Sequence, residues 1–232
     1  MPCSEKKDSI KGKKLKAPHE DVWRVFKIMS EFVEGFEVLS NLQPTVVVFG
    51  SARTPKDSPY YKMAEDVAAA LVDKGFGIAT GGGPGIMEAA NKGASEGGGS
   101  SAGINIQLPF ETSSNKFIDK DKLLRLRYFF VRKVLLTKYA QGFVIMPGGF
   151  GTIDELFEVL TLIQTGKTKK SPVVLMGKYY WEGLIDWLKN SALADNYINE
   201  EDLNLFSITD DPAEVAEIIC RFHSGKEFEP NF

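Results

Sequence analysis

Residues 142–164 read GFVIMPGGFGTIDELFEVLTLIQ, and this stretch decides the fold class. Its first five residues form a short, continuously apolar run, which is typical of a β-strand that is covered on both faces. We therefore predict a strand from Gly142 to Met146, a tight glycine-rich turn over PGGFGT, and a helix from Ile153 to Gln164. A buried strand that passes through glycines into a helix is the repeating unit of a parallel α/β sheet.

The same alternation of strand and helix continues on both sides of this stretch. The further predicted strands are Thr45–Gly50, Phe76–Thr80, Ser101–Ile106, Leu123–Tyr128 and Val173–Met176. The further predicted helices are Tyr61–Lys74, Ile86–Glu96, Phe129–Ala140, Trp181–Lys189 and Pro212–Phe222. A polar loop is predicted from Gln107 to about Lys122. This order predicts a Rossmann-like, doubly wound parallel sheet with helices on both faces.

An additional helix is predicted ahead of the first strand. Residues 1–18 are polar and include six lysines, so we predict a disordered basic tail followed by a single domain over residues 19–232. From Glu20 to Phe36 the apolar residues recur at helical spacing, and four of the residues are aromatic. Two interpretations are open: this helix packs on its own domain, or part of it covers a subunit interface, where aromatic residues are enriched.

Composition and charge exclude several classes of protein. The net charge of −3 and the pI of about 5.6 give no field that would attract nucleic acid or an anionic membrane. Cys3 and Cys220 lie at opposite ends of the chain and belong to no metal-binding pattern, so neither a disulfide framework nor a zinc site is expected. Free thiols and the lack of an apolar signal or membrane-spanning run predict a cytoplasmic protein.

Three predicted strands end in segments that suit an anionic ligand. Gly50-Ser51, Gly81–Gly85 and Pro147–Thr152 follow strands whose carboxyl ends meet at one edge of the sheet. Glycines allow the backbone to approach a ligand closely, and the helix N-terminus beyond them offers free N–H groups to an anion. We predict a phosphate cradle at residues 148–152, with the second glycine loop admitting the rest of the ligand; the alternative is that both loops are only tight turns.

The spacing of these glycines excludes the commoner nucleotide motifs. Neither loop reads G-x-G-x-x-G, because the sixth position is Ile86 in one and Asp154 in the other, and neither reads G-x-x-x-x-G-K-[ST]. A dinucleotide-dependent dehydrogenase and a P-loop NTPase are therefore disfavoured.

Three blocks in order resemble a known family. GGGPGIMEAAN at 81–91, Arg132-Lys133, and PGGFGTIDE at 147–155 are similar to the LOG (LONELY GUY) phosphoribohydrolases, whose signature PGGxGTxxE is present in all its fixed letters. The similarity extends from about Val46 to Met176, and the leading helix looks like that of the longer, type II branch. Family members often carry the label "lysine decarboxylase", but no Schiff-base lysine with a partner for a pyridinium nitrogen is evident.

The resemblance implies hydrolysis of a nucleoside 5′-monophosphate, which is AMP or an N6-substituted, cytokinin-type adenylate. The products would be the free base and ribose 5-phosphate, no metal or organic cofactor is implied, and assembly into at least a homodimer is expected. By position in the motif the catalytic pair is Arg132 and Glu155, with the carboxylate facing the positive charge that develops on the ribose. The expected substrate-binding residues are Gly50, Ser51, Gly82, Gly83, Glu111, Lys133, Met146, Gly148, Gly149, Phe150, Gly151, Thr152, Asp154 and Thr161.

Structural interpretations of the same residues stay open. Thr152 and Glu155 also fit a T-x-x-E capping box, in which both side chains bind helix N-terminal amides. Arg132 alone would be an ordinary solvated helix residue, Ser51 a helix cap and Glu88 a first-turn acid. At the level of function, the alternative is a nucleotide-binding or sensing protein that uses the same cradle without turnover.

Overall fold

The computed structural model describes residues 20–42, 44–107 and 114–232. The predicted basic tail and the predicted ligand residue Glu111 lie outside these residues. The helices are α1 (Glu20–Ser40), α2 (Pro59–Asp73), α3 (Ile86–Glu96), α4 (Phe129–Lys138), α5 (Phe150–Gln164), α6 (Lys178–Trp187) and α7 (Pro212–His223). The strands are β1 (Thr45–Phe49), β2 (Gly77–Thr80), β3 (Ser101–Ile106), β4 (Leu123–Leu126), β5 (Ala140–Ile145), β6 (Val173–Met176) and β7 (Ser207–Thr209).

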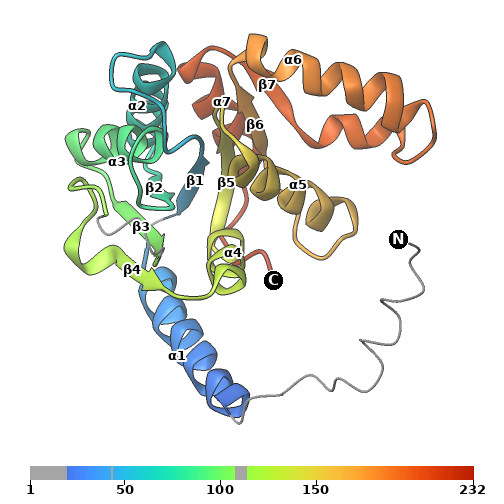
Figure 1. Ribbon diagram of the computed structural model, residues 1–232. Helices are drawn as coiled ribbons and strands as arrows, with labels where there is room; N and C mark the ends of the chain where they lie inside the picture. The colour runs from blue at the N-terminus through green and yellow to red at the C-terminus, as the bar shows by residue number, and fades with distance from the viewer. Residues whose placement is uncertain (1–19, 43, 108–113) are drawn as a thin grey trace, which may run out of the picture.

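Within the described part of the chain, seven parallel strands form one sheet in the order β4-β3-β2-β1-β5-β6-β7 (Figure 1). The chain first builds the sheet outward from β1 to β4 and then returns to place β5 against the other side of β1. This arrangement confirms the predicted doubly wound α/β fold. Because the direction of winding reverses between β1 and β5, a crevice opens beyond their carboxyl ends, where such sheets bind ligands.

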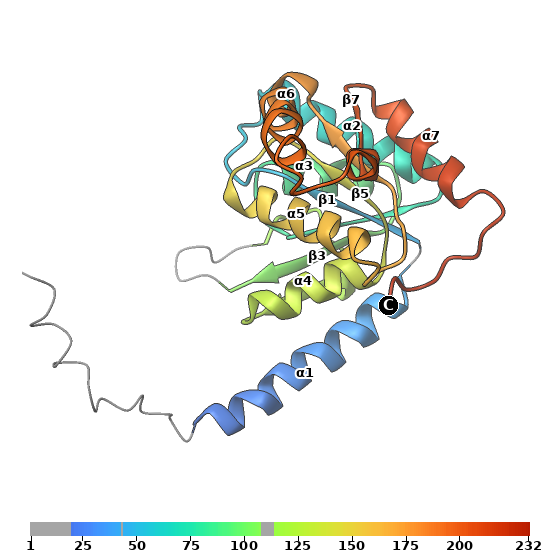
Figure 2. The ribbon, with the colours of Figure 1, turned by 90° about the vertical axis from the view of Figure 1, so that its right-hand side faces the viewer.

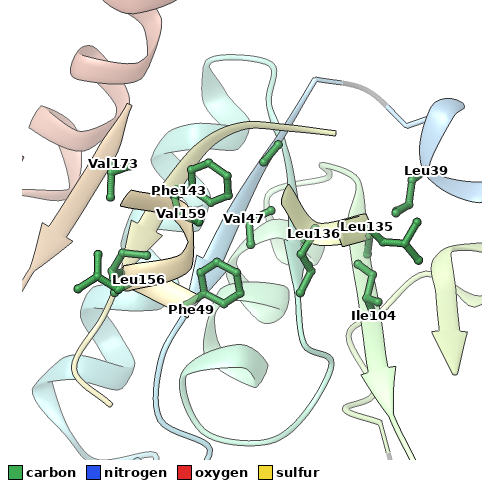
Figure 3. Close-up of a cluster of buried hydrophobic side chains, with 14 of the residues drawn as sticks. Leu39, Val47, Phe49, Ile104, Leu135, Leu136, Phe143, Leu156, Val159 and Val173 are labelled. Atoms are coloured by element: carbon green, nitrogen blue, oxygen red, sulfur yellow. The ribbon is translucent and has the colours of Figure 1, made fainter. Parts of the chain in front are cut away.

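Alternating side chains of the strands build a core on each face of the sheet. In β1, Val46 and Val48 pack with α2, α3 and α7, whereas Val47 and Phe49 pack with α4, α5 and the end of α1. Figure 3 shows the second of these clusters, in which Phe49 lies near Phe143 of β5. Since both faces are covered, the central strands β1, β2, β5 and β6 are buried along their whole length, and this explains why their sequences are largely apolar rather than alternating.

Several elements begin or end one to three residues from their predicted bounds, and the differences that matter most concern α5, β7 and the segment after α6. Helix α5 begins at Phe150, three residues before the predicted start, so the second half of the PGGFGT segment is already helical. Strand β7 was not predicted, because a three-residue edge strand carries too little pattern to be recognised. A six-residue π-helical segment, Leu188–Leu193, follows α6 directly, and a 3₁₀ segment, Glu200–Leu205, precedes β7.

Helix α1 is present as predicted and extends away from the body of the domain (Figures 1 and 2). Its C-terminal half packs on the core through Phe32, Phe36 and Leu39. Nearer its N-terminus, Trp23 is 69% exposed and Phe26 is 59% exposed. The first of the two interpretations therefore holds for the C-terminal half, and the interface interpretation of the N-terminal half stays a prediction. Among the described helices, none combines the length and the apolar character that a membrane span requires.

Candidate functional site

A cavity of about 640 Å³ lies at the carboxyl ends of the central strands. Ten of the residues predicted to bind the substrate or to act in catalysis line this cavity: Gly50, Ser51, Gly83, Arg132, Gly148, Gly149, Phe150, Gly151, Thr152 and Glu155. Residues of the wall that the sequence did not single out include Arg53, Met87, Asn105, Ile106, Phe129, Leu136 and Tyr180. The three predicted strand ends therefore meet around one cavity, at the crevice between β1 and β5.

Backbone hydrogen bonds join the loops that surround this cavity. The N–H of Ser51 donates to the carbonyl of Pro147 at 3.1 Å, and the carbonyl of Ser51 accepts from the N–H of Ile86 at 3.0 Å. Gly85 has φ +66°, and a Cβ atom there would lie 2.4 Å from the Ser51 carbonyl oxygen, so only glycine fits. The segments after β1, β2 and β5 thus hold one another in place.

The first turn of α5 has the geometry of an anion-binding site. Gly149 is the N-cap residue, and its carbonyl accepts from the N–H groups of Thr152 at 3.0 Å and Ile153 at 3.1 Å. Among the described residues, no partner accepts a hydrogen bond from the N–H groups of Phe150 and Gly151, which both belong to residues of the cavity wall. Unpaired N–H groups at a helix N-terminus, together with the helix dipole, favour a bound anion such as a phosphate.

Glu155 is buried at the cavity wall and is paired with a cation. Its side chain is 5% exposed, and Oε1 lies 3.4 Å from a terminal nitrogen of Arg132. Burial raises the pKa of Glu155 above its ordinary value, and the positive charges of Lys133 and Arg132 oppose this rise without cancelling it. The capping-box interpretation is wrong, since α5 begins before Thr152 and the hydrogen-bonding partner of Glu155 is a basic side chain.

The guanidinium group of Arg132 is held against the wall of the same cavity. It lies over the ring of Phe129, 5.2 Å from the ring centroid, and the side chain is only 16% exposed. Its Nε atom is buried and has no hydrogen-bond partner among the described residues. Arg132 is therefore a fixed part of the site rather than a solvated helix residue, and its donors are incompletely satisfied in the free protein.

Lys133 does not line the cavity, although the family resemblance implies that it contacts the ligand. Its ammonium group lies 2.8 Å from Asp154 and 3.6 Å from Oε2 of Glu155, and it also donates to Glu158. Burial lowers the pKa of Lys133, but the hydrogen bonds to Asp154 and Glu158 and the charge of Glu155 outweigh burial and raise it. Lys133 therefore carries a full positive charge between α4 and α5.

Four other predicted binding residues also lie outside the cavity wall. Met146 is fully buried, and its N–H donates to the carbonyl of Phe49 at 2.8 Å, so it connects β5 to β1. Gly82 lies behind the wall against Ile118, the Asp154 side chain is 63% exposed, and Thr161 lies on an exposed part of α5. These four residues follow the motif in sequence, but none of them is part of the cavity wall.

Tyr180 is a wall residue that carried no signal in the sequence. It comes from α6, and its hydroxyl donates to the carbonyl of Gly148 in the predicted phosphate turn. Arg53 follows Ser51 by two residues, and its backbone N–H donates to the Ser51 hydroxyl at 3.0 Å. The position of Arg53 just beyond a strand end was a usable signal, whereas Tyr180 reaches the site only through the packing of α6.

The described residues of the wall do not provide the ligands for a metal or the lysine for a Schiff-base cofactor. In residues 20–42, 44–107 and 114–232 there is no group of three His, Cys, Asp or Glu side chains that could hold a metal ion. A pyridoxal-phosphate decarboxylase needs a lysine that forms a Schiff base, and none of the described wall residues is a lysine. The residues present thus do not fit that cofactor.

Comparison with known proteins gives one family and one fold. The family model described as "Possible lysine decarboxylase" matches residues 87–219. A cytokinin riboside 5′-monophosphate phosphoribohydrolase of Mycobacterium marinum is 31% identical over 168 residues, which cover 72% of this chain and 88% of that protein. The probable phosphoribohydrolase LOG4 of Oryza sativa is 28% identical, with 74% of each chain covered.

Solved structures share the fold at low sequence identity. The X-ray structure of TM1055 superposes with a TM-score of 0.58 at 24% identity, covering 76% of this chain and 98% of that one. A molybdenum cofactor binding protein from Rippkaea orientalis gives a TM-score of 0.55 at 21% identity, with 77% and 94% covered.

Proposed function

The chain belongs to the LOG-type phosphoribohydrolase family, whose family model is described as a possible lysine decarboxylase, and from this we propose that it hydrolyses the N-glycosidic bond of a nucleoside 5′-monophosphate. The observation that carries the proposal is the buried carboxylate of Glu155 in the wall of a cavity that also contains the N-terminal residues of α5. Such a cavity can hold an anion at the helix N-terminus and a developing positive charge beside the carboxylate.

We place the 5′-phosphate at the start of α5. The unpaired N–H groups of Phe150 and Gly151 would donate to its oxygens, and Thr152 offers a hydroxyl group. Residues three apart on a helix are neighbours on its surface, so Glu155 lies one turn beyond Thr152. A phosphate bound at the helix N-terminus therefore leaves the ribose beside this carboxylate.

Cleavage of the bond between C1′ and the base nitrogen builds positive charge on the ribose, as in the transition state of glycoside hydrolysis. The Glu155 carboxylate stabilises this charge and accepts a proton from the attacking water. The hydroxide that remains adds to C1′ as the bond between C1′ and the base nitrogen breaks. The proton then passes from Glu155 to that nitrogen, which regenerates the carboxylate and gives ribose 5-phosphate and the neutral base. The Arg132 guanidinium donates to ribose or phosphate oxygens and favours the ionised form of Glu155.

The base would then occupy the part of the cavity that Met87, Ile106 and Leu136 line. Asn105 in the same wall offers an amide, which can both donate to and accept from the edge of adenine. The proposed substrate is therefore AMP or an adenylate with an apolar N6 substituent.

The direct test is chromatographic detection of free base and ribose 5-phosphate after incubation with AMP and with isopentenyl-AMP. We expect release from at least one of them, and little from adenosine, which lacks the phosphate that the start of α5 would bind. Glu155→Gln serves as the matched inactive variant, since it keeps the shape of the side chain. Tight nucleotide binding by the wild-type protein without release of base would refute hydrolysis and favour the sensing function.

We also propose assembly into at least a dimer, supported by the exposed Trp23 and Phe26 of α1. Light scattering coupled to size exclusion tests this, and a purely monomeric protein would refute it.

A further inference from the structure

The carboxylate of Glu155 is held by a different cation at each of its two oxygens. Arg132 lies 3.4 Å from Oε1, on the side of the cavity. Lys133 lies 3.6 Å from Oε2, and it is not part of the cavity wall. Both cations come from α4, whereas the carboxylate comes from α5, so the two contacts fix the plane of the carboxylate between two helices.

We infer that Lys133 is a positioning residue, which holds Glu155 in its orientation and in its ionised form from behind the cavity, without touching the substrate. The inference rests on the proposed function and goes beyond it, because the resemblance to the family implies a ligand contact at this position.

The surroundings of Lys133 suit such a role. Its side chain is 18% exposed and lies among three carboxylates of α5, those of Asp154, Glu155 and Glu158. Asp154 and Glu158 anchor the ammonium group through short ion pairs, so it is not free to extend into the cavity. Because two ion pairs already hold the Lys133 side chain, its interaction with Glu155 costs less conformational entropy than an isolated ion pair would.

The charge of Lys133 also favours the ionised form of Glu155. Burial and the neighbouring charges of Glu158 and Asp154 all favour the protonated form of Glu155, whereas Lys133 and Arg132 favour the ionised form. Arg53, from the segment after β1, is the other cation of the cavity wall. Without Lys133, Arg132 would be the remaining cation in contact with Glu155 among the described residues. Glu155 would then stay protonated, and so unable to accept a proton from water, up to a higher pH.

The principal test replaces Lys133 by methionine, which keeps the length of the side chain and removes its charge. We expect the acid limb of the pH profile of kcat/KM to move upward by about one pH unit, since an opposite charge at this distance lowers a carboxyl pKa by about that much or more. At a pH below the shifted limb, kcat should fall roughly tenfold. KM and the calorimetric affinity for ribose 5-phosphate should stay within about twofold of wild type, because Lys133 lies outside the wall.

Two further variants make the test specific. Lys133→Arg restores a positive charge and should return the acid limb toward its original position, and it also serves if the methionine variant does not fold. Glu158→Gln removes a charge that raises the pKa of Glu155, so the acid limb should move in the opposite direction, to lower pH. A merely structural role of Lys133 predicts no such pair of opposite shifts.

The outcomes separate this inference from the proposed function. If the wild-type protein releases no base, the proposed function fails, whereas an NMR titration of the Glu155 carboxyl carbon in wild-type and Lys133→Met protein still tests the inference. An upward shift of that titration, with unchanged ribose 5-phosphate affinity, supports a positioning role. Loss of ribose 5-phosphate affinity with an unmoved titration would overturn it and make Lys133 a ligand contact.

Discussion

Gly148→Ala is a substitution whose effect follows directly from the geometry of the site. A Cβ atom at Gly148 would lie 2.1 Å from Oγ1 and 2.7 Å from Cβ of Thr152, and 3.0 Å from the nitrogen of Ser51. Rotation of the Thr152 side chain moves Oγ1 but not Cβ. The first turn of α5 must therefore retreat by about 0.7 Å, which is the difference between 2.7 Å and the ordinary contact distance of 3.4 Å.

We expect Gly148→Ala to lower both the stability of the protein and its catalytic rate. Overpacking of this kind lowers the free energy of unfolding by about 1–3 kcal/mol. The retreat also displaces the N–H groups of Phe150 and Gly151 from the proposed phosphate position, and a displacement approaching 1 Å reduces a reaction rate by roughly 100-fold. We therefore expect a folded but less stable protein with a large loss of kcat/KM.

Gly151→Ala is the matched control. A Cβ atom at Gly151 would meet no protein atom within 4 Å, and alanine is favoured over glycine inside a helix by roughly 0.5–1 kcal/mol. Stability should thus be equal or slightly higher, whereas the added methyl group enters the space proposed for the phosphate and weakens its binding.

Urea denaturation and calorimetry with ribose 5-phosphate separate the two effects. Equal urea midpoints for wild-type and Gly148→Ala protein would refute the packing argument. Wild-type affinity for ribose 5-phosphate in Gly151→Ala would show that the phosphate binds elsewhere.

Three further substitutions have defined outcomes. Glu155→Gln should lower kcat by about 10²–10⁴-fold. Because burial raises the pKa of Glu155 in the folded state, the stability of the wild-type protein should fall as the pH rises from 4.5 through that raised value. Urea midpoints measured across this pH range should fall less in the variant. Tyr180→Phe removes the hydroxyl group that binds the Gly148 carbonyl, and calorimetry should show about fivefold weaker ribose 5-phosphate binding, equivalent to about 1 kcal/mol; unchanged binding would make this contact irrelevant to the ligand. Asn91→Ala leaves the buried hydroxyl of Thr80 without the acceptor that lies 2.6 Å away, and chemical denaturation should show a loss of about 2–3 kcal/mol in the free energy of unfolding. An unchanged midpoint would contradict a stabilising role for this hydrogen bond.

The sequence predicted the architecture well because the pattern that encodes it is local. Apolar runs such as residues 142–146 are typical of a parallel strand that is covered on both faces, and glycines follow the ends of β1, β2 and β5 within a few residues. Strand β7 was not predicted, because its three residues are stabilised by pairing with β6, which is a tertiary contact.

The candidate site was predicted in part. The PGGFGT segment and Glu155 could be placed at one edge of the sheet, since carboxyl ends of parallel strands meet there. The position of Tyr180 could not be predicted, because its contact with Gly148 depends on how α6 packs beyond β6. The surroundings of Lys133 could not be predicted for a related reason: the motif fixes its position in the sequence, whereas its contact with Glu155 depends on the packing of α4 against α5.

The sequence by itself determined the order of the helices and of the strands β1 to β6, the edge of the sheet at which the candidate site lies, and the glycines that allow the loops there to approach one another closely. These properties follow from interactions between residues that are near one another in the chain. Only the tertiary structure decided that Glu155 lies between two cations, one on each side, and that α5 begins within the turn. The physical reason is that burial and charge pairing depend on which helices pack together, and short-range patterns in a sequence do not contain that information.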